Sequence, residues 1–359
     1  MEHCTIPSEM GTENMQNKTK QMLTALFFII VCIVAYLFIG KGQENQSASE
    51  QIFAMDTYME ITAYGKNCKE AVQTAKEEIE RLDALLSTGS NQSEISLLNS
   101  NKTGQISEDT QYLLERSLDI YRETNGAFDI TIYPIMRAWG FTGEEQKIPD
   151  SAELENLLKL VDASKLQYDA ATHILTLPEG VEIDFGGIAK GYTSQRVAQI
   201  MQEYEISSAI MNLGGNVQLV GTKNDGSPWK VAIKSPNEQE EYLGVLSAQN
   251  KAVITSGGYE RYFEENGTKY HHIIDPKTGM PAYNGLQSVT IISEDGTLAD
   301  GLSTALYVMG TDKAIQFWRN HSAEFDAILY TEDGTLYATQ GIADAFTSNH
   351  QISVLSQAQ

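Results

Sequence analysis

The chain has 359 residues, a formal net charge of −23 at pH 7 and a pI of about 4.6. This length suffices for one large domain or two small ones with a full hydrophobic core. The charge argues against nucleic acid as a partner and against direct adhesion to anionic lipid, because phosphates repel such a surface. The three cysteines are an odd number, and Cys32 lies inside an apolar run, so they predict neither a disulfide framework nor a thiolate metal site.

An uncharged, almost wholly apolar run covers residues 22–39. It reaches the lower length limit of a transmembrane helix and lacks the polar face that a buried helix of a soluble domain usually keeps. No small-x-small cleavage pattern or lipobox cysteine follows it, so we expect an uncleaved anchor, with a cleaved signal peptide as the alternative. Residues 1–21 are then a cytoplasmic tail and residues 40–50 a polar tether, and the remainder is expected to lie outside the cytoplasm at the cell membrane.

In the first half of the domain the sequence predicts one strand followed by several helices. Alternation of apolar and polar residues from Ile52 to Tyr64 predicts a strand with Met55-Asp56-Thr57 at its start. Apolar residues that recur every three or four positions predict helices at 69–86, 94–99, 109–124 and 151–160. A hairpin is expected at 166–177. The turn after Gly126, which carries Phe128 and Asp129, fits either a helix stop with core packing or a ligand pocket.

Residues 181–192 predict a strand, a Gly186-Gly187 turn and a helix. Glycines let a phosphate approach the backbone, the helix N-terminus supplies N–H donors, and Lys190 adds a positive charge. A Gly-Gly turn before a helix is also ordinary structure, and the spacing matches neither the dinucleotide-binding fingerprint nor the P-loop.

In the second half of the domain the sequence predicts short strands and two further helices. Strands are expected at 208–220 (a pair), 229–233, 252–256, 270–274, 287–293, 326–330 and 335–338, and helices from 299 onward and over 311–319. Helices mixed with many short strands and hairpins indicate an α+β fold. Residues 51–340 are expected to form the domain, and residues 341–359 a C-terminal tail without a readable pattern.

Asp300 and Thr304 are the candidate metal ligands. They lie four residues apart, so both oxygens share one face of the helix expected to open at Ala299. Two hard oxygens near free backbone N–H groups at a helix N-terminus suit Mg²⁺ with a phosphorylated ligand. An ordinary capping role for Asp300 is the alternative.

Seven short motifs in one order resemble the ApbE-like FAD:protein FMN transferases, over residues 50 to 340 approximately. They are Met55-Asp56-Thr57; Gly126 to Thr131 with Trp139-Gly140-Phe141; Ile183 to Tyr192; Asn212 to Asn216; Thr255-Ser256-Gly257; His272 to Gly279; and Ala299-Asp300 with Thr304-Ala305. The resemblance implies a T-fold-like α+β domain that binds FAD and Mg²⁺. It also implies transfer of the FMN half of FAD to a Thr or Ser hydroxyl of an acceptor protein outside the cytoplasm, with release of AMP.

The resemblance also implies the roles of individual residues. The expected FAD contacts are Met55, Ala127, Phe128, Asp129, Lys190, Arg196 and Ile274. The expected Mg²⁺ ligands are Asp300, Thr304 and a main-chain oxygen of Thr193, with Ser303 nearby. His272 and Asp275 are expected beside the diphosphate, where His272 would accept the proton of the attacking hydroxyl.

Two other functions stay open at this point. One is an FAD pyrophosphatase, in which water replaces the protein hydroxyl. It is favoured by Gly89, which stands where relatives often present a larger side chain to the flavin. The other is a membrane-anchored flavin-binding protein without turnover.

Overall fold

The computed structural model describes residues 46–143, 145–237 and 239–357. The apolar run at 22–39, predicted as a membrane anchor, lies outside these residues. Within the described ranges no helix combines the length and the apolar character needed to cross a membrane.

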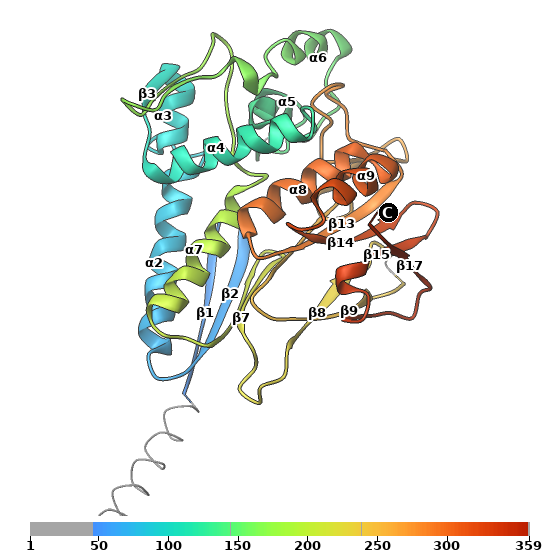
Figure 1. Cartoon of the computed structure of the whole chain (residues 1–359). Helices are drawn as coiled ribbons and strands as arrows, with labels where there is room; N and C mark the ends of the chain where they lie inside the picture. The colour runs from blue at the N-terminus through green and yellow to red at the C-terminus, as the bar shows by residue number, and fades with distance from the viewer. Residues whose placement is uncertain (1–45, 144, 238, 358–359) are drawn as a thin grey trace, which may run out of the picture. The chain divides into compact units, whose positions relative to one another are not determined.

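The centre of the domain is a nine-stranded sheet (Figure 1). Its strands in spatial order are β1 (Ser47–Ala54), β2 (Thr57–Tyr64), β6 (Ser208–Leu213), β7 (Asn216–Gly221), β10 (Ala252–Gly257), β13 (Leu286–Ser293), β14 (Asp326–Thr331), β15 (Leu336–Thr339) and β17 (Ile352–Leu355). Neighbouring strands are antiparallel except for the parallel pair β15–β17. Side chains alternate between the two faces, so each face needs its own cover.

Helices cover one face of this sheet. They are α2 (Cys68–Leu86), α7 (Ala189–Glu203), α8 (Gly296–Met309) and α9 (Thr311–His321). The apolar side of α2 packs on β1 and β2, α8 packs on β10 and β13, and α7 lies between α2 and α8 (Figure 1). The small sheet β16 (Phe346–Thr347), β9 (Tyr242–Ala248) and β8 (Trp229–Lys234) covers the opposite face of the β7-to-β15 half.

The remaining elements gather beyond one end of the sheet and helices (Figure 1). They are α3 (Glu94–Asn101), α4 (Glu108–Glu123), η1 (Ile130–Ile132), α5 (Tyr133–Ala138), α6 (Ser151–Leu158), η2 (Ala163–Lys165), the sheet β3 (Thr103–Gln105), β5 (Ile174–Thr176) and β4 (Gln167–Asp169), and the hairpin β11 (Tyr262–Glu265) and β12 (Thr268–His271). The short turn η3 (Gln340–Ile342) lies elsewhere, beside β14 and the small sheet of β8 and β9. The α+β class and each helix predicted between residues 69 and 160 are confirmed. The predicted hairpin at 166–177 and the predicted strand pair at 208–220 are confirmed as well.

The single strand predicted over Ile52 to Tyr64 is wrong, because the chain reverses at Met55 and Asp56. Both residues adopt the left-handed backbone conformation, with φ of 50° and 57°, and they form a two-residue hairpin turn between β1 and β2. The carboxylate of Asp83 accepts a hydrogen bond from the Met55 amide at 3.0 Å, which holds the turn against α2.

The strand predicted at the start of residues 181–192 is also wrong. The segment before α7 has no strand partner, and the backbone groups of Ile183 are satisfied by a side chain. The amide of Asn99 donates to the Ile183 carbonyl and accepts from the Ile183 amide, both at 2.8 Å. A buried side-chain amide can satisfy both polar groups of one residue in this way.

The domain is longer at both ends than the sequence predicts. Residues 47–50, expected in the tether, belong to β1. The expected tail contributes β16, which pairs with β9, and β17, which forms the sheet edge beside β15. The strand β9 was missed, because its apolar residues do not alternate regularly with polar ones.

Candidate active site

Asp300 lies in the second turn of α8, not at its start. The helix begins at Gly296 and is capped by Asp295, whose carboxylate accepts from the Leu298 amide at 2.9 Å. The predicted capping or first-turn position of Asp300 is therefore wrong. Its side chain is 5% exposed, and its Oδ2 accepts a hydrogen bond of 2.7 Å from the Gly191 amide of α7.

A close approach of two helices holds Asp300 in this position. A Cβ atom on Gly191 would lie 2.2 Å from the Gly296 carbonyl oxygen and 2.5 Å from the Asp300 Cβ. Only glycine allows the α7 backbone to come this near to α8. Gly191 is the third residue of α7, so its amide has no partner within the helix and is available to Asp300.

Three hydroxyl groups lie near Asp300. The Ser256 hydroxyl, at the end of β10, is 2.8 Å from the Ser303 hydroxyl and 3.3 Å from that of Thr304. The Ser303 hydroxyl also donates to the Asp300 carbonyl at 2.8 Å. The structure thus brings Asp300, Ser303 and Thr304 together as predicted and adds Ser256, which the sequence offered only as part of a motif.

The positive charge of Lys190 acts on the Asp300 carboxyl. Burial raises the pKa of the Asp300 carboxyl, and the Lys190 ammonium and the Gly191 hydrogen bond oppose that rise. The pKa of Asp184 is likewise raised by burial and opposed by its bond with the Gly186 amide and by the charges of Lys190 and Arg261. Asp184 was not predicted as a site residue, although it stands inside the motif quoted from Ile183 to Tyr192.

His272 is held as a neutral imidazole. The Arg261 carbonyl oxygen accepts a hydrogen bond from the His272 backbone amide at 3.0 Å and lies 3.2 Å from its ring Nδ1. A carbonyl only accepts, so Nδ1 carries the proton and Nε2 keeps its lone pair. Burial, followed by the charge of Arg261, lowers the pKa of His272 to about 3.

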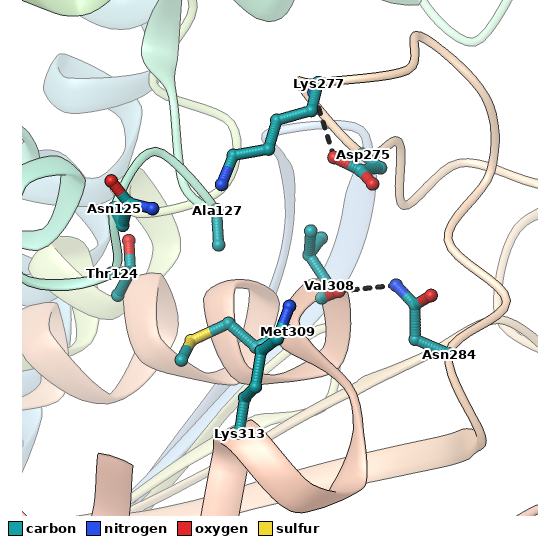
Figure 2. A pocket seen from close by; sticks show the side chains of 9 residues that line it. All are labelled: Thr124, Asn125, Ala127, Asp275, Lys277, Asn284, Val308, Met309 and Lys313. Carbon is teal, nitrogen blue, oxygen red and sulfur yellow. Dashed lines mark hydrogen bonds between the residues drawn. The ribbon is translucent and has the colours of Figure 1, made fainter. Parts of the chain in front are cut away.

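Asp275 lines a pocket of about 250 Å³ (Figure 2). Its Oδ1 accepts from the Lys277 amide at 2.9 Å and so stabilises its own turn. Ala127 lines the same pocket, together with Thr124, Asn125, Lys277, Asn284, Val308, Met309 and Lys313. The ammonium groups of Lys277 and Lys313 point into the pocket in Figure 2.

Two of the other predicted FAD residues, Phe128 and Met55, contact Gly187 or Thr193, and the remainder contact other parts of the protein. Phe128 packs beneath Gly187, where a Cβ would lie 2.9 Å from its ring, and Met55 Sδ lies 3.7 Å from the Thr193 hydroxyl. Ile274 is buried in the apolar cluster of Ile135 and Trp139.

Asp129 and Arg196 have partners within the protein. The Asp129 carboxylate accepts from the Thr131 amide and hydroxyl and from the Ala163 amide, so it organises its own loop. Arg196 pairs with Glu78 of α2 at 3.4 Å. Neither side chain hydrogen-bonds to Asp300 or Lys190.

The donor set near Asp300 fits a hard cation. In the described residues no three His, Cys, Asp or Glu side chains form a metal-binding group. The available donors are one buried carboxylate, hydroxyls and carbonyls, the oxygen types that Mg²⁺ prefers.

The carbonyl predicted as a metal ligand is a poor choice. Thr193 lies inside α7, where its carbonyl belongs to the helical hydrogen-bond ladder, and its hydroxyl donates to the Ala189 carbonyl at 2.8 Å. Gly187 precedes α7, and no backbone amide of the described residues donates to its carbonyl.

Known proteins match both the sequence and the fold. A model of the ApbE family matches residues 55–329. The FAD:protein FMN transferase of Haemophilus influenzae is 32% identical over 286 residues, 76% of this chain and 82% of the relative. The transferase of the same name from Treponema pallidum is 29% identical over 340 residues, 88% of this chain and 93% of the relative.

Solved structures agree with these relatives. The ApbE protein of Thermotoga maritima superimposes with a TM-score of 0.78 at 32% identity, covering 84% of this chain and 99% of that one. The flavin transferase ApbE of Vibrio cholerae gives 0.75 at 27% identity, with coverage of 84% and 99%. Fold and site together define an enzyme of the flavin transferase class. The chain belongs to the ApbE family.

Proposed function

We propose that this enzyme transfers the FMN half of FAD, through its phosphate, to a Thr or Ser hydroxyl of an acceptor protein and releases AMP. The observation that carries the proposal is the Asp300 group, in which a buried carboxylate, three hydroxyls and the Lys190 charge lie close to the Gly191 amide at the start of α7. The names of the matched relatives supply the substrate and the transferred group.

The residues near Asp300 would hold Mg²⁺ and the diphosphate of FAD. Asp300, Thr304 and the Gly187 carbonyl would hold the cation, with Ser303 nearby. Mg²⁺ bound there would supply Lewis-acid neutralisation of the charge that develops on the phosphate oxygens. Lys190 would add a fixed positive charge beside the same oxygens.

The transfer step exchanges one phosphorus–oxygen bond for another. The acceptor hydroxyl oxygen forms a bond to the FMN-side phosphorus while the bond from that phosphorus to the bridging oxygen breaks, and AMP leaves with the bridging oxygen. The hydroxyl proton passes to Nε2 of His272, which is neutral and keeps its lone pair. Asp275 would not take part directly, because its carboxylate is engaged in its own turn.

One incubation separates this proposal from its two alternatives. The full-length protein is mixed with FAD, Mg²⁺ and a candidate acceptor protein that has an exposed Thr or Ser. A covalently fluorescent acceptor with one AMP per flavin supports transfer. Free FMN with AMP would identify a pyrophosphatase, for which the exposed loop around Gly89 leaves room, and intact bound FAD would identify a flavin carrier.

We further propose that the domain works outside the cytoplasm, anchored by the apolar run at residues 22–39. Protease added to intact cells is expected to digest the domain, while a cytoplasmic marker protein stays whole. Full protection of the domain until the cells are lysed would contradict this location.

A further inference from the structure

Asn216 is a buried side chain that the reaction described above does not use. It is the first residue of β7, directly after the Gly214-Gly215 turn, and it is 3% exposed. Its amide nitrogen is buried and has no partner in hydrogen-bond geometry among the described residues. Buried donors without partners are rare in native proteins, so this one requires a physical reason.

The position of Asn216 on β7 directs it toward Asp300. Side chains alternate along the strand, and Val220, on the same face, packs with Val197 of α7. Gln218, between them on that face, has its Oε1 3.2 Å from the point where a Cβ on Gly296 would lie, at the start of α8. Asn216 therefore lies beneath the contact between α7 and α8.

Asp300 is the acceptor available at this place. Its Oδ2 accepts from the Gly191 amide, and it stands one helical turn after Gly296, on the same face of α8. A donor on this side of the carboxylate would fix its rotation. The hydroxyls of Ser303 and Thr304 lie on α8 beside it.

We propose that Asn216 is a positioning residue whose buried amide orients the Asp300 carboxylate toward the cation. The proposal rests on the proposed function only in taking Asp300 as a ligand of a divalent cation. Residues behind a metal ligand typically change the metal affinity about 10- to 100-fold when they are removed.

Mn²⁺ binding to the full-length protein tests this without any turnover. Mn²⁺ replaces Mg²⁺ at oxygen sites, and the free ion is counted by its electron paramagnetic resonance signal. Asn216→Leu, which has nearly the same volume but no amide, is expected to raise the Mn²⁺ dissociation constant about tenfold. Asn216→Ser, which keeps a shorter donor, is expected to recover part of the affinity.

Gln218→Met is the matched control. Gln218 lies on the same face of the same strand, is 5% exposed and also has a buried polar atom without a partner among the described residues. It adjoins Gly296 and not Asp300, so its substitution is expected to leave the Mn²⁺ dissociation constant within about twofold of wild type.

Three results would overturn the proposal. They are unchanged Mn²⁺ affinity in both Asn216 variants, an equal loss in Gln218→Met, and a wild-type protein that binds no Mn²⁺. Should Asn216→Leu fail to fold, Asn216→Ser decides, because a hydroxyl is tolerated in place of the amide. A wild type that binds Mn²⁺ in the expected way but modifies no acceptor would refute FMN transfer and leave the role of Asn216 standing.

Discussion

Replacing Gly191 by alanine is expected to damage stability and activity together. The added methyl group would lie 2.2 Å from the Gly296 carbonyl oxygen and 2.5 Å from the Asp300 Cβ, so α7 and α8 must separate. Overpacking of this kind costs about 1–3 kcal/mol, and loss of the charge-assisted hydrogen bond to Asp300 about 1.5–3 kcal/mol. Alanine favours the helix over glycine by about 1 kcal/mol, which offsets part of this loss. We therefore expect the free energy of unfolding to fall by about 1.5–5 kcal/mol.

The assay is urea unfolding, followed by flavin transfer measured under conditions where the variant is folded. A displacement of Asp300 by about 1 Å is expected to slow transfer about 100-fold. Gly104→Ala is the control, since the nearest atom to its added Cβ would be Leu98 Cδ1 at 3.7 Å, an ordinary contact. A Gly191→Ala protein that is as stable and as active as Gly104→Ala would refute the role assigned to the helix contact.

Three further predictions follow from single side chains. Asp300→Ala is expected to abolish metal-dependent transfer at saturating FAD, whereas Asp295→Asn, altered at the helix cap, should stay active; retained turnover in Asp300→Ala would contradict the assignment. Burial lowers the pKa of His271 to about 4, so below pH 6.5 the unfolded chain takes up a proton that the native state does not. The free energy of unfolding should therefore fall by up to about 1.4 kcal/mol per pH unit between pH 6.5 and 4, and by less in His271→Leu, as urea unfolding at several pH values would measure; equal slopes would refute this. Asn99→Leu leaves the Ile183 amide and carbonyl without partners and should cost about 2–4 kcal/mol in the same unfolding assay, while an unchanged midpoint would show that other groups satisfy them.

The helices over 69–86 and 109–124 were predictable because their apolar residues recur at the helical period, and the face they bury is continuous. The hairpin at Met55 was not predictable from alternation. A two-residue turn keeps the pattern in phase across both strands, and neither Met nor Asp in the pair signals a left-handed turn as strongly as Asn-Gly.

The C-terminal strands show a second limit of periodicity. β16 has two residues and β17 four, too short for alternation to be distinguished from chance. They form because β16 pairs with β9 and β17 pairs with β15, and β9 lies about 100 residues earlier in the sequence than β16.

By itself, the sequence determined the order of the motifs, the α+β class and the pairing of Asp300 with Thr304 on one helical face, because these depend on local spacing. Only the tertiary structure decided what surrounds that pair. The contact of α7 with α8 at Gly191 brings an amide of the first turn of α7 to Asp300, and the end of β10 brings Ser256 to the same place. These groups come from three separate segments, so their meeting depends on helix packing and strand order, which no local pattern encodes.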